Sequence, residues 1–377
     1  MRICFNTLSM KVGGGVTYMT ELIHGLARVD RKNEYLLLGL EDKRSLFLPD
    51  DKRFSFFAFP FTARSTPARM IWEQARLPGW LRKMGIDVLF SPGNYGLLFP
   101  GCRQVLCIQN SYDALALADS ARTRLRWAVL SRLTRSTAKT SQRIVTVSEE
   151  MVRMTHRVFG ISPENIISIH HGVSAAFHPI PVDEAGPRVS ERFKASGEFL
   201  LCVSDFYINK NYLNMVRAFS LVREKNPGMS LVIAGRGYDV AVYKAVLALI
   251  DELKLTDAVR LIGTVPRDVL NDLYSASRAF VFPSKVESFG LPQIEAMACG
   301  APVVTSNMSA MPEICGDAAA YFNPDDPADM AKAVLSVVEN ESVRQNLIRK
   351  GFERITHFSW DRCAQQYLEV FESVAAK

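Results

Sequence analysis

The sequence predicts an α/β protein built from two Rossmann-like domains, whose mainly parallel sheets face each other across a cleft. Three observations support this prediction. The 377 residues exceed what one hydrophobic core usually supports. Short β-branched and aromatic runs alternate with helical segments along the chain. A segment rich in proline and charge, residues 179–196, reads as a linker, so we expect domains at 1–180 and 181–357 and a last helix within 358–377.

The composition describes a soluble globular protein. Apolar residues make up 48% and charged residues 22% of the chain, and about 18 uninterrupted apolar residues, as a membrane-spanning helix needs, occur nowhere in it. The first ten residues read as a strand rather than as a signal peptide. The seven cysteines show neither paired nor metal-ligand spacing, which is typical of a reducing compartment. We therefore expect a cytoplasmic protein without a bound metal.

The charge is divided unevenly between the two halves. Residues 1–180 hold 24 Lys and Arg against 14 Asp and Glu, or +10, whereas residues 181–377 hold 21 against 25, or −4. The most basic segment, residues 121–143, fits a helix with Leu125, Val129, Leu130 and Leu133 near one face. This helix either packs on the core with a solvated basic face or docks on an anionic membrane. No nucleic-acid module accompanies the charge, so we expect no nucleic-acid partner.

Strands and helices alternate through the first domain. The expected strands are residues 2–6, 35–39, 53–59, 87–90, 105–108, 144–148 and 166–173. The expected helices are residues 17–28, 70–84 and 149–159, the last capped by Ser148. In the helix 70–84, Ile71, Trp72, Ala75, Leu77 and Trp80 take the apolar positions.

Candidate ligand-binding loops follow several of these strands. The run Gly13-Gly14-Gly15 after the first strand either brings backbone amides close to a phosphate or sugar, or forms a plain tight turn. Asn94 and the pair Gln109-Asn110 follow two later strands, and α/β sheets bind ligands at the carboxyl ends of their strands. His170 and His171 are interpreted as a loop pair, because no third ligand lies at metal-binding spacing.

The second domain repeats the alternation. Its expected strands are residues 199–203, 230–234, 259–263, 279–282 and 302–305, and its helices are 212–225, 269–277, 292–299 and 325–340. The last helix of the chain, 360–375, follows this domain. Lys210 lies in the first turn between strand and helix, and Gly235-Arg236 follow the next strand. These positions again lie at carboxyl ends.

The most informative segment is Val281–Thr305, which reads as strand, loop, helix and strand. Pro292 suits the first turn of a helix, and Gly290 before it permits a backbone conformation or a close ligand approach that a Cβ would block. Free amides at a helix start attract phosphate. Glu287 precedes the helix and Glu295 lies one turn into it, where a glutamate is either a partner of the helix dipole or an acceptor for ligand hydroxyls.

This segment resembles the donor-binding signature of the retaining GT-B glycosyltransferases of family four, the glycosyl transferases group 1. The signature residues are Glu287, Phe289-Gly290-Leu291-Pro292 and Glu295, followed by Ala-Met-Ala-Cys-Gly-Ala-Pro-Val-Val; Ser288 stands where members often have glycine. The resemblance implies transfer of a hexose, such as mannose, from a GDP- or UDP-linked sugar to a glycan or lipid-linked acceptor. It implies a retaining reaction without cofactors, in bacterial surface polysaccharide synthesis at the inner face of the membrane. It also implies that the last helix packs back on the first domain.

The resemblance assigns roles to individual residues. Lys210 and the amides of Phe289, Gly290 and Leu291 would stabilise the departing diphosphate, while Glu287 would orient the donor sugar and Glu295 the ribose; Glu287 and Lys210 are thus the candidate catalytic residues. Further donor-binding positions implied are Gly14, Gly15, Gly235, Arg236, and the backbones of Val259 and Leu261 for the base. Asn94, Gln109 and Asn110 would lie on the acceptor or donor-sugar side.

Two departures from the family keep other functions open. Gln109 stands where many relatives carry a histidine, and Ser204-Asp205 where they often carry an arginine, a charge that Arg236 could supply. A nucleotide-sugar epimerase, a phosphorylase or an inactive nucleotide-sugar-binding subunit would use the same architecture. A dehydrogenase is disfavoured, because the first βα turn lacks Gly-x-Gly-x-x-Gly.

Overall fold

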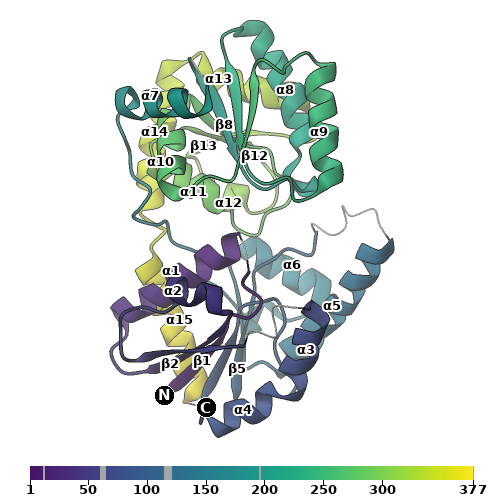
Figure 1. Cartoon of the computed structure of the whole chain (residues 1–377), viewed down its shortest axis with the longest axis vertical. Helices are drawn as coiled ribbons and strands as arrows, with labels where there is room; N and C mark the ends of the chain where they lie inside the picture. Colours follow the sequence, from purple (N-terminus) through teal and green to yellow (C-terminus); the bar gives the residue numbers. More distant parts are fainter. Residues whose placement is uncertain (12, 60–64, 114–120, 195–196, 377) are drawn as a thin grey trace. The chain divides into compact units, whose positions relative to one another are not determined.

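The computed structural model describes residues 1–11, 13–59, 65–113, 121–194 and 197–376, which form two compact units (Figure 1). Unit 1 comprises Met1–Gly172 and Ser359–Lys377, and unit 2 comprises Val173–Phe358. The division falls eight residues before the predicted boundary at 180, since 180 − 172 = 8. Phe177 is buried in the core of unit 2, and the amide of His178 donates to Asn271 Oδ1 at 3.0 Å, which ties this segment to the second unit.

Unit 1 is a seven-stranded parallel sheet covered by helices, in the order β3-β2-β1-β4-β5-β6-β7. Its strands are β1 (Arg2–Asn6), β2 (Glu34–Gly39), β3 (Phe54–Ala58), β4 (Val88–Ser91), β5 (Arg103–Ile108), β6 (Arg143–Thr146) and β7 (Ile166–Ser168). Its helices are α1 (Gly14–Val29), α2 (Arg44–Phe47), α3 (Thr66–Ala75), α4 (Leu77–Lys83), α5 (Ala121–Thr140), α6 (Glu149–Phe159) and α15 (Trp360–Ala375).

Unit 2 is a six-stranded parallel sheet in the order β10-β9-β8-β11-β12-β13. Its strands are β8 (Phe199–Val203), β9 (Ser230–Ala234), β10 (Val259–Gly263), β11 (Ala279–Phe282), β12 (Val303–Ser306) and β13 (Ala319–Phe322). Its helices are α7 (Val182–Phe193), α8 (Tyr212–Lys225), α9 (Val240–Glu252), α10 (Arg267–Ala276), α11 (Leu291–Ala298), α12 (Met311–Cys315), α13 (Pro327–Val338) and α14 (Glu341–Ile355).

The predicted fold class is confirmed, because both units are Rossmann-like α/β layers on parallel sheets. In each sheet the strand order reverses next to the unit's first strand, between β1 and β4 in unit 1 and between β8 and β11 in unit 2. Crevices at the carboxyl ends of the strands beside such a reversal are where open α/β sheets bind ligands. The loops after these four strands are therefore the places to look for a site.

Local sequence explains where individual helices begin and end. Ser148 accepts a hydrogen bond from the amide of Met151 at 3.2 Å, as the predicted cap of α6 requires. Gly160 closes the same helix at φ 64°, a left-handed conformation that costs glycine little. The segment 179–196, predicted as a linker, instead contains α7, because Ala185 and Val189 are buried on one side of it.

The helix predicted over 70–84 is two helices, and its buried face is only partly the expected one. Leu77 is fully buried and Trp72 and Trp80 pack against the core, as predicted. The break falls at Arg76, two residues before Pro78, since proline removes an amide donor and restricts the residue before it. Ile71 is 70% exposed, whereas Arg69 and Glu73 are 5% and 2% exposed. Apolar periodicity therefore identified only part of the inner face of α3, because two of the buried side chains there are charged.

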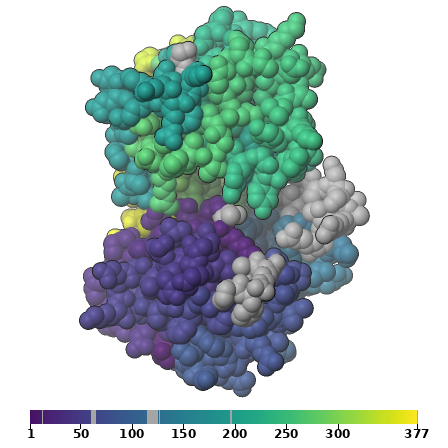
Figure 2. All heavy atoms as spheres, in the orientation of Figure 1, coloured from purple at the N-terminus to yellow at the C-terminus, as the bar shows by residue number. Residues whose placement is uncertain are grey.

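The last helix, α15, belongs to unit 1 and packs along α1 (Figure 1). The phenol of Tyr18 on α1 donates to that of Tyr367 on α15 at 2.6 Å, and both side chains are fully buried. At the start of α15, Trp360 stacks on His171 with ring centroids 5.4 Å apart. In the space-filling view, the side of unit 1 that faces the viewer is formed mainly by residues from the first half of the chain, in purple and blue (Figure 2).

Candidate active site

The loop between β11 and α11 has the geometry that its sequence predicts. Gly290 precedes the helix with φ 103°, and a Cβ on it would lie 2.0 Å from Gln293 Oε1. Gln293 is fully buried, and its Nε2 donates to Thr305 Oγ1 at 2.8 Å, so it has little room to move away. Position 290 therefore requires glycine. With Pro292 in the first turn of α11, the predicted strand, loop, helix and strand are all present.

The two candidate catalytic residues contact each other. Lys210 ends a short 3₁₀ turn after β8, Glu287 lies in the loop after β11, and the lysine Nζ donates to Glu287 Oε1. Only 17% and 14% of the two side chains are exposed. The ammonium also lies 5.5 Å from the ring centroid of Phe282, the last residue of β11. The tertiary structure thus holds a cation and a carboxylate at the switch point of the second sheet.

Neighbouring polar residues fix the two loops that carry this pair. Asn209 bridges them, because its Nδ2 donates to Val286 O at 3.0 Å and its carbonyl accepts from the amide of Lys285 at 2.9 Å. Asn211 adopts φ 58° at the start of α8, and its Nδ2 donates to Pro283 O at 3.3 Å. Neither asparagine was predicted as a site residue, although both lie directly beside Lys210 in the sequence.

Ser309 holds the backbone of Glu287 directly. Its hydroxyl accepts from the amide of Glu287 at 3.1 Å and donates to the carbonyl of the same residue at 2.7 Å. Ser309 itself adopts φ 56°, which is unusual for a residue other than glycine. No sequence motif predicts this contact, because the two residues lie in loops that follow different strands.

Glu295 is the fifth residue of α11, in its second turn. Its Oε2 accepts a hydrogen bond from the Tyr274 phenol on α10 at 3.2 Å. Burial, reinforced by the neighbouring carboxylate, raises the pKa of Tyr274 well above its usual value, so this phenol remains a hydrogen-bond donor. The contact orients Glu295 beside the amino end of α11, and the role of the carboxylate toward a ribose remains a prediction.

Gly235 and Arg236 follow β9, and the structure separates their contributions. A Cβ on Gly235 would lie 1.8 Å from Ser204 O, so the loops after β8 and β9 can approach only because this residue is glycine. Arg236 Nη2 donates to Asp205 Oδ2 at 2.8 Å, and Nε to Oδ1 at 3.3 Å. Although burial opposes ionisation of Asp205, hydrogen bonds from Arg236 lower its pKa. Asp205 therefore neutralises the charge that Arg236 was expected to supply.

The two residues expected to hold the nucleotide base lie at different positions along β10. Val259 begins the strand and is buried, while Leu261 lies at its middle. Gly263 ends the strand, and its carbonyl accepts from the amide of Gly235 at 2.8 Å. The residues at the carboxyl edge beside the glycine loop are thus Gly263 and those that follow, which the sequence analysis did not name.

In unit 1, the predicted acceptor-side residues form one cluster. Asn94 is buried with φ 67°, and its Oδ1 accepts from the amides of Gln109 and Asn110 at 3.0 and 2.9 Å. Its Nδ2 donates to the carbonyl of Asn110 at 2.8 Å, while Gln109 Nε2 donates to Pro92 O. The side-chain amide of Gln109 is thereby engaged with the protein itself.

Helix α1, which follows the glycine turn of unit 1, begins at Gly14, three residues before the predicted start at 17. Gly13 caps α1 with φ 70°, and Gly14 and Gly15 belong to the first turn of the helix rather than to a loop. A Cβ on Gly15 would lie 3.0 Å from Met10 Sδ, and Gln109 Nε2 lies 3.9 Å from the same sulfur. The turn and the Asn94 cluster therefore meet at one edge of the sheet, although Val12 lies outside the described residues.

The described part of the chain shows no sign of two other classes of site, a membrane span and a metal centre. None of its helices is both long and apolar enough to cross a bilayer. Within the same ranges, no three His, Cys, Asp or Glu side chains gather as metal ligands would.

Comparison with known proteins identifies the architecture and then the family. The structure superposes on the sucrose-phosphate synthase from Thermosynechococcus elongatus with a TM-score of 0.78 and 19% identity, over 100% of this chain and 99% of that one. Two parallel Rossmann-like units of this kind define the GT-B glycosyltransferase fold. The model described as Glycosyltransferase Family 4 matches residues 12–177, and that described as Glycosyl transferases group 1 matches residues 184–354. The chain belongs to glycosyltransferase family four, and the family predicted from Glu287 to Glu295 is confirmed.

Relatives with a named activity align over part of their length. The chain is 29% identical over 231 residues to the O-antigen chain mannosyltransferase B of Escherichia coli, which covers 61% of this chain and 60% of that protein. It is 30% identical over 243 residues to the glycogen synthase of Mycobacterium tuberculosis, covering 63% of this chain and 55% of that protein. The alignments thus span less than two thirds of either relative.

Proposed function

We propose that this protein is a retaining hexosyltransferase that moves a sugar, mannose in the first instance, from a GDP- or UDP-linked donor to a glycan or lipid-linked acceptor. The observation that carries the proposal is the Lys210–Glu287 pair beside the glycine-capped start of α11. A lysine and free helix amides suit the diphosphate of the donor, and a carboxylate suits the hydroxyls of its sugar.

In the proposed reaction, the bond between the sugar's C1 and the phosphate oxygen breaks, and a bond from C1 to the acceptor oxygen forms on the same face. Lys210 and the amides of Phe289, Gly290 and Leu291 stabilise the charge that develops on the leaving diphosphate. The acceptor's proton passes to the leaving phosphate. Glu287 orients the sugar hydroxyls and Glu295 the ribose, and the step as proposed employs no metal ion or other cofactor.

Mannose and surface polysaccharide are favoured by the Escherichia coli relative, which is named an O-antigen chain mannosyltransferase. A lipid-linked acceptor would place the protein in the cytoplasm at the inner face of the membrane. Helix α5 fits such a location, because Leu125 and Val129 are 68% and 53% exposed and Arg132 is exposed on the same face. Sedimentation with phosphatidylglycerol vesicles tests this part: wild type should bind, and Leu125→Glu with Val129→Glu should not.

A second candidate is a nucleotide-sugar-binding subunit without turnover. It is favoured by Gln109, whose amide is engaged with Pro92 O, and by Asp205, which neutralises Arg236. An epimerase of the same fold would convert the sugar of the donor without transferring it to an acceptor.

Donor binding and nucleotide release separate these functions. Thermal unfolding with UDP, GDP, ADP and their sugars identifies the donor, since a ligand that binds the native state raises the melting temperature. The donor that binds is then incubated with methyl α-mannopyranoside or an oligomannose acceptor. Release of nucleotide together with a new α-linked product supports transfer, whereas binding without release supports the inactive subunit. Conversion of the donor sugar without any acceptor would indicate the epimerase.

A further inference from the structure

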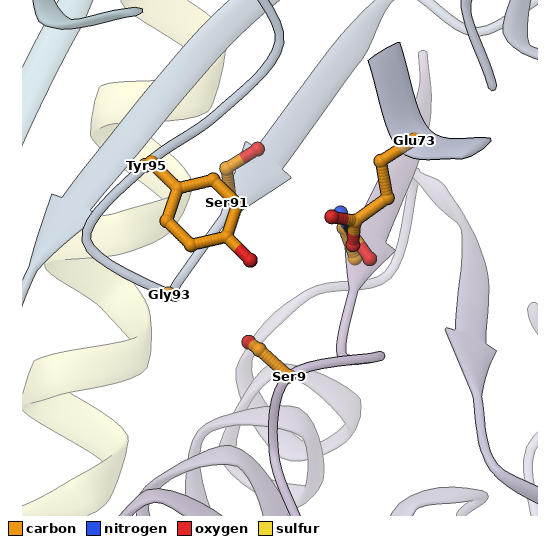
Figure 3. A pocket seen from close by; sticks show the side chains of 6 residues that line it. Ser9, Glu73, Ser91, Gly93 and Tyr95 are labelled. Carbon is orange, nitrogen blue, oxygen red and sulfur yellow. Dashed lines mark hydrogen bonds between the residues drawn. The ribbon is translucent and has the colours of Figure 1, made fainter. Parts of the chain in front are cut away.

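Unit 1 contains a small polar pocket beside the strand reversal of its sheet (Figure 3). It lies where β1 and β4 end, and it is lined by Asn6, Ser9, Glu73, Ser91, Gly93 and Tyr95. The enclosed space suits one water molecule or one hydroxyl group. Asn6 and Ser91 are the last residues of neighbouring strands, so this is the location where a sheet of this topology binds ligands.

The wall contributed by α3 is a buried carboxylate that is only half satisfied. Glu73 Oε1 accepts from Asn6 Nδ2 at 3.1 Å and lies 3.8 Å from Arg69 Nε. Glu73 Oε2 has no hydrogen-bond partner among the described residues, although the residue is 2% exposed. Burial raises the pKa of this carboxyl. A buried acceptor without a partner destabilises the native state, so the open oxygen of Glu73 calls for an explanation such as a bound group.

Two further hydroxyls at the pocket have hydrogen-bonding capacity to spare. Ser91 Oγ is buried and without a partner in the part of the chain that the structure describes. The oxygen of Tyr95 accepts from Arg69 Nη2 at 2.7 Å, which leaves its own proton to be donated elsewhere. In Figure 3 the Tyr95 phenol and the Glu73 carboxylate point toward the same space from opposite sides. The pocket therefore offers both an acceptor and donors.

The charge of the surrounding groups restricts the class of ligand. The Arg69 guanidinium offsets the charge of Glu73, so the pocket as a whole is close to neutral. An anion would meet the unpaired Glu73 oxygen, and a metal ion would find no second carboxylate among the lining residues. A neutral hydroxyl group, which both donates and accepts, matches what the walls present.

We propose that this pocket receives a hydroxyl group of the saccharide acceptor, with Glu73 Oε2 accepting a hydrogen bond from it and Tyr95 or Ser91 donating one to its oxygen. The inference rests on the proposed function and assigns an acceptor-recognition role to residues outside the family signature. Asn94 lies in the sequence between the lining residues Gly93 and Tyr95, and its side chain accepts hydrogen bonds from the amides of Gln109 and Asn110. The pocket therefore adjoins the residues predicted for the acceptor side.

Gly93 allows the pocket to be blocked without removing a polar group. A Cβ on this residue would lie 2.6 Å from Ser9 Oγ and 3.3 Å from Ser9 Cβ, so even one methyl group would fill the opening. Gly93→Ala therefore tests space, and Glu73→Gln tests the carboxylate while nearly preserving its shape. Glu34→Gln is the matched control, because this glutamate is on the surface of the same unit with 62% of its side chain exposed.

The experiment measures two quantities on the full chain. Saturation-transfer NMR reports binding of methyl α-mannopyranoside, and steady-state transfer reports KM for the same acceptor and for the nucleotide sugar. Both pocket variants should weaken mannoside binding and raise the acceptor KM about 10- to 100-fold, the loss expected for a hydrogen bond to a charged group. The donor KM and the melting temperature of Gly93→Ala should stay at wild-type values, as should every value for Glu34→Gln.

The outcomes distinguish the pocket from the proposed function. Wild-type acceptor KM and mannoside binding in both variants would overturn the pocket and mean that it holds only water, while transfer itself stands. If wild type binds mannoside but transfers no sugar, loss of that binding in both variants still supports the pocket although the proposed function fails.

Discussion

Lys210 donates to Glu287 across two loops of unit 2, so the residue assigned to the leaving diphosphate and the residue assigned to the sugar share one ion pair. Each side chain is mostly buried, and each keeps the other in place. If the donor binds as proposed, its phosphate and hydroxyl groups would replace part of this pair. The pair thus positions the two groups in advance without presenting an uncompensated buried charge.

Removing the lysine tests the role of this pair. Lys210→Ala should lower kcat about 100- to 1000-fold, because the developing charge on the diphosphate loses its cation. Lys285→Ala is the control, since its ammonium pairs with Asp325, 59% of whose side chain is exposed. Steady-state kinetics with circular dichroism as a folding check measures both. Wild-type turnover in a folded Lys210→Ala protein would remove the lysine from the mechanism.

Ser309 should act on the reaction through Glu287. Ser309→Ala removes both hydrogen bonds to the Glu287 backbone, so we expect kcat to fall about tenfold with little change in nucleotide affinity. Ser309→Gly also lacks the hydroxyl but accommodates φ 56° without strain. Equal losses of kcat in the two variants indicate positioning by the hydroxyl. Recovery of activity in Ser309→Gly alone would show that backbone conformation is what matters.

Gly290→Ala should disrupt the start of α11. The new Cβ would meet Gln293 Oε1 at 2.0 Å, and alanine at φ 103° is strained by about 1–3 kcal/mol. We expect a lower free energy of unfolding and at least a tenfold weaker binding of the nucleotide product by calorimetry. Gly228→Ala is the matched control, because its Cβ would meet nothing within 4 Å. A Gly290→Ala protein with wild-type nucleotide affinity would argue against a phosphate site here.

The buried imidazole of His171 should make unit 1 sensitive to acid. Burial, and secondarily the charge of His170, lowers the pKa of His171 from its ordinary value of 6.5 to about 3. The unfolded chain then binds the extra proton first, so stability is full above pH 6.5 and is lost as the pH falls toward 3. The total effect is about 5 kcal/mol at most.

Chemical denaturation between pH 7 and pH 5 measures this dependence. His171→Phe keeps a ring against Trp360 and should lose less stability than wild type over this interval. His156→Gln removes an exposed histidine and should follow the wild-type curve. A His171→Phe protein whose stability falls as steeply as that of wild type would show that another group carries the acid sensitivity.

Sequence patterns were most informative where a local conformation restricts the residue type. Gly290 with Pro292 predicted a helix start, and alternating apolar runs predicted both parallel sheets, because these features depend on neighbours along the chain. Part of the inner face of α3 escaped the same reasoning. Arg69 and Glu73 are buried there because each finds partners from other elements, among them Tyr95 and Asn6, that periodicity does not reveal.

The sequence by itself determined the two-domain α/β class, the family and the loop from Glu287 to Glu295. Only the tertiary structure decided which charges meet: Lys210 pairs with Glu287 across 77 positions, and Asp205 pairs with Arg236 across 31. The physical reason is that parallel strands bring their carboxyl ends to one edge of a sheet whatever their separation in the chain. The net charge of a site therefore depends on side chains from several loops at that edge, and no single segment of the sequence reveals it.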